Sequence, residues 1–176
     1  MTHLQAIAQL PMLVRVVGYG VRSVTQHYLS KSPRPLIRGL VLTNRCNLRC
    51  QHCRVTERAT SDMMFKEACD VIDAYYREGG RCLYLEGGEP FLWRDGAYRL
   101  EHIVRYAHDR GYLTVVVFTN GMFPINTTAD TAFVSVDGLH ETHDALRGKS
   151  FDRIIENIQT SDHRSIFVNY TINSRN

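Results

Sequence analysis

Residues 46–53 read Cys46-Asn47-Leu48-Arg49-Cys50-Gln51-His52-Cys53, which places three cysteines at a C-x3-C-x2-C spacing. The stretch directly follows an apolar, strand-like run at 36–43, and its arginine and asparagine side chains are not typical of a buried core. Three thiolates in one loop can bind three corners of a cubic 4Fe-4S cluster and leave the fourth iron open to another ligand. The spacing therefore predicts that Cys46, Cys50 and Cys53 are metal ligands.

Two alternative interpretations of this loop remain open. A zinc site would complete a Cys3His set with His52 or a distant residue, although the spacing lacks the two paired halves typical of structural zinc sites. Alternatively, the three cysteines are unrelated thiols of a core. The other two cysteines, Cys69 and Cys82, fall within a predicted helix and at the start of a predicted strand, which is typical of buried structural thiols.

Length and composition favour a single domain in a reducing compartment. With 176 residues, 44% of them hydrophobic, the chain is long enough for one domain with a sizeable core. The five cysteines are an odd number and no secretory signal is apparent, which favours a cytoplasmic protein without a disulfide framework. The net charge of +3 comes from the N-terminal third, since residues 1–56 hold eight Lys and Arg and no acidic residue. We expect no nucleic-acid partner.

The N-terminal segment, residues 1–32, is predicted to form an amphipathic basic helix. Apolar side chains recur at helical spacing over residues 4–29, with two arginines between them. A proline, two glycines and those arginines argue against a transmembrane span. The helix either packs on the remaining domain or lies on an anionic membrane surface, so that peripheral membrane contact through residues 4–29 is one of two alternatives.

From residue 33 onward, strand-like and helix-like segments alternate. The pattern predicts strands at 36–43, 82–86, 113–118, 131–136 and 166–172, and helices at about 62–78, 98–110 and 151–159. Ser61 or Asp62 is the expected N-cap of the first of these helices. The connection at 122–130 contains a proline and many turn formers, which predicts a loop or a single helical turn. Such alternation is typical of an α/β fold with a parallel sheet.

Chemically distinctive residues follow each predicted strand. In parallel sheets of this kind, functional residues gather at the carboxyl ends of the strands. We therefore expect one rim to carry five of these residues, namely Cys46, Gly87, Asn120, Asp137 and Asn173. Five strands are too few to close an eight-stranded barrel, which predicts a truncated or at least a minimal chain.

A second motif, Gly87-Gly88-Glu89-Pro90, ends the second predicted strand. Two glycines allow a backbone to approach a ligand closely, and a carboxylate and a rigid turn former follow them. Alone, this motif is an ordinary turn. Its significance comes from its position one strand–helix unit after the cysteine loop.

Together these motifs resemble the signatures of the radical S-adenosylmethionine (radical SAM) enzymes. The likeness extends through Thr119-Asn120-Gly121, Ser135-Val136-Asp137-Gly138 and the stretch 143–148, and covers roughly residues 36–173. It implies a radical SAM core domain over residues 33–176, built as a partial (β/α) barrel. Such cores usually have six strands, and about five are expected here, so the domain is predicted to be truncated before its last strand.

The resemblance also implies the cofactors and the reaction. Cys46, Cys50 and Cys53 would bind a 4Fe-4S cluster, and the amino and carboxylate groups of SAM would chelate its open iron. One electron, supplied by a reductant such as flavodoxin or ferredoxin, would cleave SAM to methionine and a 5′-deoxyadenosyl radical. The radical would abstract hydrogen from a substrate that the sequence does not identify. The alternative is a truncated cluster-binding protein without catalysis.

Individual residues take roles by the same resemblance. Gly87, Gly88 and Glu89 would receive the amino group of SAM, while Ser135 and Arg147 would hold its carboxylate or ribose. His52 occupies a position that is usually an aromatic residue near the adenine. Asn169 or Asn173 would bond the ribose hydroxyls. Simpler roles are an exposed ion pair for Arg147, a strand-end cap for Ser135 and turn chemistry for Asn120.

Overall fold

The computed structural model describes residues 35–58, 62–172, 174 and 176, together with eight residues between 14 and 29. The chain divides into two units, Met1–Leu36 and Ile37–Asn176. The eight described residues between 14 and 29 are helical and exposed, and the rest of the predicted helix at 4–29 lies outside the described residues. Among the described residues, no helix combines the length and apolar character that a membrane span requires. Membrane contact stays a prediction.

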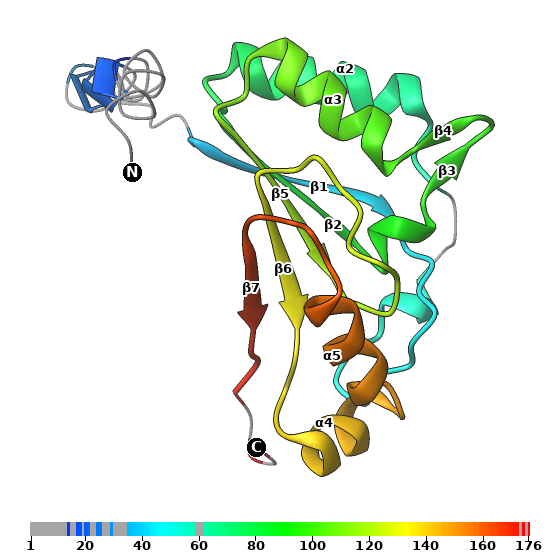
Figure 1. Cartoon of the computed structure of the whole chain (residues 1–176). Coiled ribbons are helices and arrows are strands. Elements are labelled where there is room, and N and C mark those ends of the chain that lie inside the picture. The colour runs from blue at the N-terminus through cyan, green and yellow to red at the C-terminus, as the bar shows by residue number, and fades with distance from the viewer. Residues whose placement is uncertain are drawn as a thin grey trace. The chain divides into compact units, whose positions relative to one another are not determined.

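A parallel sheet of five strands forms the second unit, in the order β1-β2-β5-β6-β7 (Figure 1). Neighbouring strands pair in parallel at every step. The strands are β1 (Ile37–Thr43), β2 (Cys82–Gly87), β5 (Thr114–Thr119), β6 (Thr131–Ser135) and β7 (Ile166–Asn169). The predicted α/β fold with a parallel sheet is confirmed. The last strand is shorter than the predicted 166–172, because its pairing with β6 ends at Asn169.

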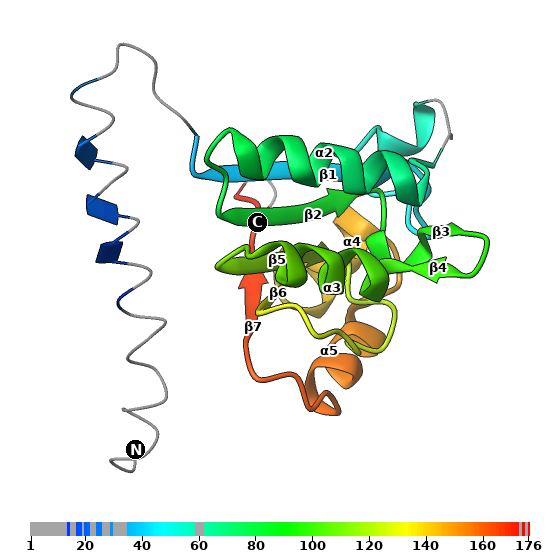
Figure 2. The same cartoon turned by 90° about the horizontal axis from the view of Figure 1, so that it is seen from above.

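Two helices, α2 (Phe65–Arg77) and α3 (Leu100–Arg110), lie on one face of the sheet (Figure 2). Alternate residues of β1, β2 and β5 point toward them and form the main core, which includes Leu40, Leu42, Leu83, Leu85, Val115, Val117, Ile72, Ile103 and Val104. A smaller core joins β6 to α5 (Phe151–Gln159) through Ala132, Val134 and Ile154. The sheet is therefore anchored by its helices on one face.

The alternate residues of the same strands carry a row of aromatic rings. Tyr84, Phe118, Phe133 and Phe167 follow one another across β2, β5, β6 and β7, with ring centroids 5.3, 5.0 and 5.5 Å apart. In β2, β5 and β6 each ring alternates along its strand with core residues that pack on the helices, and Phe167 of β7 pairs with Phe133, so the row lies on the opposite face of the sheet. Packing of these rings ties together the strands that carry the site described below.

Helix α2 begins at Phe65 with Met64 as its N-cap, two residues later than expected with Asp62 as the cap. The Asp62 carboxylate instead accepts hydrogen bonds from the Thr43 hydroxyl and the Arg45 guanidinium. The first turn is capped by the Glu67 carboxylate, which accepts from the Met64 amide at 2.8 Å. Ser61, the other predicted cap, lies outside the described residues. Asp62 therefore does not cap α2, because its carboxylate pairs with Arg45 at the cysteine loop.

Several short elements were not expected from the sequence. They are the 3-10 turns η1 (Val55–Glu57) and η2 (Pro90–Leu92), the hairpin β3 (Arg94–Asp95) and β4 (Tyr98–Arg99), and the helix α4 (His140–Arg147). The hairpin displaces the start of α3 from the expected residue 98 to Leu100. The connection at 122–130 is a loop, as predicted. Helix α4 escaped prediction because its buried face is formed largely by polar residues, including His143 and Arg147.

Candidate functional site

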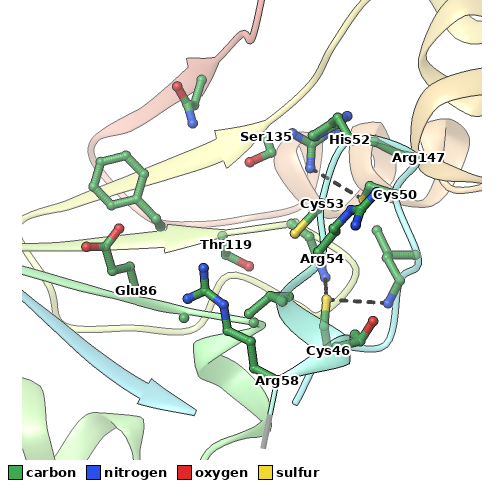
Figure 3. Close-up of a pocket in the computed structure, with 18 residues that line it drawn as sticks. Cys46, Cys50, His52, Cys53, Arg54, Arg58, Glu86, Thr119, Ser135 and Arg147 are labelled. Atoms are coloured by element: carbon green, nitrogen blue, oxygen red, sulfur yellow. Dashed lines mark hydrogen bonds between the residues drawn. The ribbon is translucent and has the colours of Figure 1, made fainter. Parts of the chain in front are cut away.

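A cavity of about 470 Å³ lies at the carboxyl ends of the strands (Figure 3). Most of the predicted site residues line it, namely Cys46, Cys50, His52, Cys53, Gly87, Gly88, Asn120, Ser135, Arg147 and Asn169. Residues that are about 40 to 120 positions apart in the chain thus meet around one space. Glu89 and Asp137 are fully buried and are not among the lining residues. Asn173 lies outside the described residues, so its predicted role is untested.

The first part of the cysteine loop is fixed by the end of β1. The Arg45 amide donates to the Thr43 hydroxyl at 3.0 Å, and the Arg45 guanidinium pairs with Asp62 and donates to the Leu92 carbonyl at 2.9 Å. These bonds hold the backbone immediately before Cys46 against two neighbouring segments. The position of Cys46 is therefore fixed by its attachment to the end of β1.

The two glycines of the second motif pack directly on the same backbone. The Gly88 amide donates to the Thr43 carbonyl at 2.7 Å, and the Glu89 amide donates to the Arg45 carbonyl at 2.8 Å. A Cβ atom on Gly88 would lie 2.2 Å from the Arg45 carbonyl oxygen, and one on Gly87 would lie 2.3 Å from the Thr43 oxygen. Only glycine allows this close approach. The glycines thus join the motif to the cysteine loop in addition to lining the cavity.

The Glu89 carboxylate lies behind the cavity wall and is hydrogen-bonded to three donors. Its Oε1 atom accepts from the Phe91 amide at 3.1 Å and the Thr119 hydroxyl at 2.9 Å, while Oε2 accepts from the Asn120 amide at 2.7 Å. Burial raises the pKa of Glu89 to about 7, although the three donors favour the charged form. Because a carboxylate has about four acceptor positions, one position on Oε2 is left for a further donor.

This raised pKa predicts a pH-dependent stability. Between its ordinary pKa of 4.5 and about 7, Glu89 is protonated in the folded chain and ionised in the unfolded chain. The free energy of unfolding therefore falls as pH rises through this window, by up to about 3 kcal/mol from this group. Urea unfolding of the metal-free wild type and of Glu89→Gln, at about pH 5 and about pH 7.5, measures the contribution. The stability advantage of the wild type over the variant is expected to be larger at the lower pH; an unchanged difference would contradict the assignment.

Nitrogen donors approach two of the three cysteine sulfurs. Cys46 Sγ accepts from the Leu48 amide at 3.5 Å and from the Asn120 side-chain amide at 3.6 Å, and Arg147 Nη1 lies 3.9 Å from Cys50 Sγ. Burial raises the pKa of Cys46 and of Cys50, while the charge of Arg147 acts against burial at Cys50. Metal binding must therefore displace protons from these thiols, and the donors favour the thiolate form.

The model of the radical SAM superfamily matches residues 40–173, more than half of the sequence. The chain belongs to the radical SAM superfamily. This family uses a 4Fe-4S cluster together with SAM, as expected from the sequence.

Curated relatives in the superfamily have diverse activities. The chain is 28% identical over 176 residues to an Fe-coproporphyrin III synthase of Methanosarcina barkeri, covering 90% of this chain and 43% of the relative. It is 33% identical to an AdoMet-dependent heme synthase of the same organism, covering 77% of this chain and 42% of that protein. The radical SAM chain thus spans less than half the length of these relatives.

Solved structures support the same fold. SuiB of Streptococcus suis bound to the precursor peptide SuiA matches with a TM-score of 0.62 and 16% identity, over 77% of this chain and 32% of SuiB. A native anSMEcpe with bound AdoMet and Cp18Cys peptide matches with a TM-score of 0.58 and 19% identity, over 77% and 42% of the respective chains. This likeness confirms the partial radical SAM barrel.

The donor set of this radical SAM chain fits a cluster held by three thiolates. Cys46, Cys50 and Cys53 are free of disulfides and line one cavity. Within the described ranges, no three His, Cys, Asp or Glu side chains converge on a single metal position. A cubic cluster does not require such convergence, because each thiolate binds a different iron.

Other residues around the cavity carried no clear sequence signal. Arg54, Arg58 and Glu86 also line it (Figure 3). The two arginines lie just after the cysteines, and Glu86 points away from the core because it alternates along β2 with Leu85. That alternation could have identified Glu86. In the sequence, the two arginines cannot be told from ordinary exposed charges. Only the fold shows that they line the cavity.

Proposed function

We propose that this chain binds a 4Fe-4S cluster through Cys46, Cys50 and Cys53 and uses it to cleave SAM reductively. When bound, the reduced cluster supplies one electron to the sulfonium of SAM, which gives methionine and a 5′-deoxyadenosyl radical for hydrogen abstraction. The observation that carries the proposal is the convergence of three free thiols and the Gly87–Gly88 backbone on one cavity.

The cavity residues divide the binding of SAM between them. Gly87 and Gly88 line the cavity and offer backbone groups to the amino end of methionine. Glu89 lies behind the two glycines, and its Oε2 atom has one acceptor position left. Ser135 and Arg147 border the side of the cavity formed by β6 and α4, where a hydroxyl and a guanidinium suit a carboxylate or ribose. His52 and Asn169 also line the cavity, which supports roles for them near the adenine and the ribose.

Anaerobic reconstitution tests this proposal. The 176-residue chain is incubated with ferrous iron and sulfide, then with SAM and either dithionite or reduced flavodoxin, and 5′-deoxyadenosine is measured by chromatography. We expect formation of 5′-deoxyadenosine that requires both SAM and reductant. A protein that takes up iron and sulfide but yields no 5′-deoxyadenosine would defeat the catalytic proposal for this chain.

A second candidate is a cluster-binding protein without catalysis. It is favoured by the share of two curated relatives that the 176-residue chain spans, which is only 43% and 42%. The same experiment separates the candidates, because this one predicts a cluster but no SAM cleavage. Zinc in place of iron and sulfide would instead support the zinc interpretation of the cysteine loop.

A further inference from the structure

Helix α4 is bound directly to the cysteine loop. Between Cys50 and Cys53, the Gln51 amide donates to the Leu146 carbonyl at 2.8 Å, and the Gln51 side chain donates to the Ala145 carbonyl at 2.6 Å. The next residue of the helix, Arg147, directs Nη1 toward Cys50 Sγ at 3.9 Å (Figure 3). The carboxyl end of α4 therefore sets the position of the loop and of a cation beside one sulfur.

Arg147 is held in this position by a buried carboxylate. Its Nε atom donates to Asp137 Oδ2 at 2.5 Å, and the side chains are 9% and 0% exposed. The other oxygen, Asp137 Oδ1, accepts from the Thr171 amide at 2.9 Å. Asp137 follows the end of β6, and its carboxylate is also held by the segment after β7. The carboxylate in turn fixes the Arg147 guanidinium.

A neutral histidine fixes the backbone of this carboxylate. The Asp137 amide donates to His143 Nδ1 at 3.2 Å, and His143 Nε2 lies 3.0 Å from Ser150 Oγ. Because Ser150 Oγ donates its hydrogen to the Gly148 carbonyl at 2.8 Å, His143 Nε2 is the donor toward Ser150. The buried ring thus bonds through both nitrogens without carrying a charge, so its contact with Asp137 is not an ion pair, unlike that of Arg147.

A fixed cation beside a cluster ligand has a predictable electrostatic effect. Uptake of one electron makes a cluster more negative, so a nearby positive charge and an N–H donor to a ligand sulfur stabilise the reduced form. Arg147 Nη1 faces the sulfur, whereas Asp137 bonds to Nε on another side of the guanidinium. The positive end of the pair is therefore directed at Cys50.

We propose that Arg147, held by Asp137, is a positioning residue that raises the reduction potential of the cluster through Cys50, independently of any contact with SAM. The inference rests on the proposed function, because it requires a cluster on the three cysteines. In the redox step, one electron passes from an external reductant to the oxidised cluster, and no covalent bond is broken.

The test is an EPR-monitored redox titration of the reconstituted chain in the absence of SAM. The primary variant is Arg147→Lys, which leaves a cation for Asp137 and so avoids an unpaired buried charge. The single ammonium of lysine cannot reproduce the forked contacts to both Asp137 and Cys50. At a fixed potential, we expect the ratio of reduced to oxidised cluster to fall about tenfold, which corresponds to about 59 mV for one electron.

Arg45→Lys is the matched control. Arg45 also pairs with an aspartate, which is partly buried, and anchors the cysteine loop, but its hydrogen bonds go to Asp62 and Leu92 rather than to a sulfur. Its variant is expected to leave the potential unchanged. An equal shift in the control would mean that any disturbance of the loop changes the potential, and it would overturn the specific role of Arg147.

A second variant keeps the inference testable if Arg147→Lys fails to bind the cluster. The double substitution Asp137→Asn with Arg147→Gln removes both charges together, which leaves no buried ion without a partner. It is also expected to lower the potential. An unchanged potential in the variants, with only weaker SAM binding, would overturn the inference and assign Arg147 to SAM alone. Failure of cluster binding, the part of the proposed function on which the inference rests, is distinguishable, because the wild type would then give no cluster signal at all.

Discussion

Gly88→Ala is expected to lower the free energy of unfolding by about 3 kcal/mol or more and to reduce iron uptake by the cysteine loop strongly. The added Cβ would lie 2.2 Å from the Arg45 carbonyl oxygen and 2.8 Å from the Asn44 oxygen. Both are backbone atoms, so no side-chain rotation relieves the overlap. Either β2 or the loop before Cys46 must move, and the hydrogen bond from the Gly88 amide to Thr43 is lost.

Gly39→Ala is the control for this substitution. Gly39 lies in β1, next to the same strand, but its added Cβ would meet only the carboxylate end of the Glu86 side chain, at 2.8 Å. Because that end can rotate away, the change is expected to cost little and to leave iron uptake intact. Urea unfolding and iron analysis after reconstitution measure both variants. Equal behaviour of Gly88→Ala and Gly39→Ala would show that the close packing on the loop is not required.

The glycine pair explains why the fold and the site were predictable together. A backbone contact between the end of β2 and the start of the cysteine loop requires residues without a Cβ, and the sequence displays that requirement as Gly87-Gly88. The strands were recognisable for a similar reason, because buried parallel strands need continuous apolar runs. Both patterns can be recognised in short stretches of sequence, although the contacts that they predict are tertiary.

The parts that escaped prediction depend on distant partners. Asp62 has the side chain of a helix cap, but it pairs with Arg45 instead, and no local pattern shows this choice. Helix α4 buries His143 and Arg147 because Asp137, from a neighbouring strand end, supplies their partners. Glu89 was expected at the cavity and is behind it, since its oxygens accept from residues at the end of β5. Polar networks of this kind are formed by the fold and leave little periodicity in the sequence.

Replacement of any one of Cys46, Cys50 and Cys53 by alanine is expected to abolish the cluster and the production of 5′-deoxyadenosine. Two remaining thiolates leave a second corner of the cube without its protein ligand, and nothing in the described part of the chain converges as an alternative metal-binding trio. Analysis of iron and sulfide after reconstitution, about four of each per chain in the wild type, measures the loss.

Cys69→Ala and Cys82→Ala are the matched controls for the loss of a thiol. Cys69 is buried within α2, and Cys82 begins β2 at the end of the strand away from the cavity, so neither lines it. Both variants are expected to keep the cluster, with Cys69→Ala costing about 1 kcal/mol of stability for the lost packing. Loss of iron from these controls would mean that the thiols act through folding rather than as ligands.

His52→Ala separates the cluster from the zinc alternative on the same loop. His52 lies between the last two cysteines and lines the cavity, with Nε2 at 3.9 Å from Asp137 Oδ2. A Cys3His zinc site that is completed by His52 would lose a ligand in this variant and bind zinc much more weakly. A cluster held by three thiolates needs no imidazole, so iron and sulfide are expected to remain at the wild-type level. The outcome depends only on which atoms bind the metal, and it therefore tests the ligand set apart from SAM binding or catalysis.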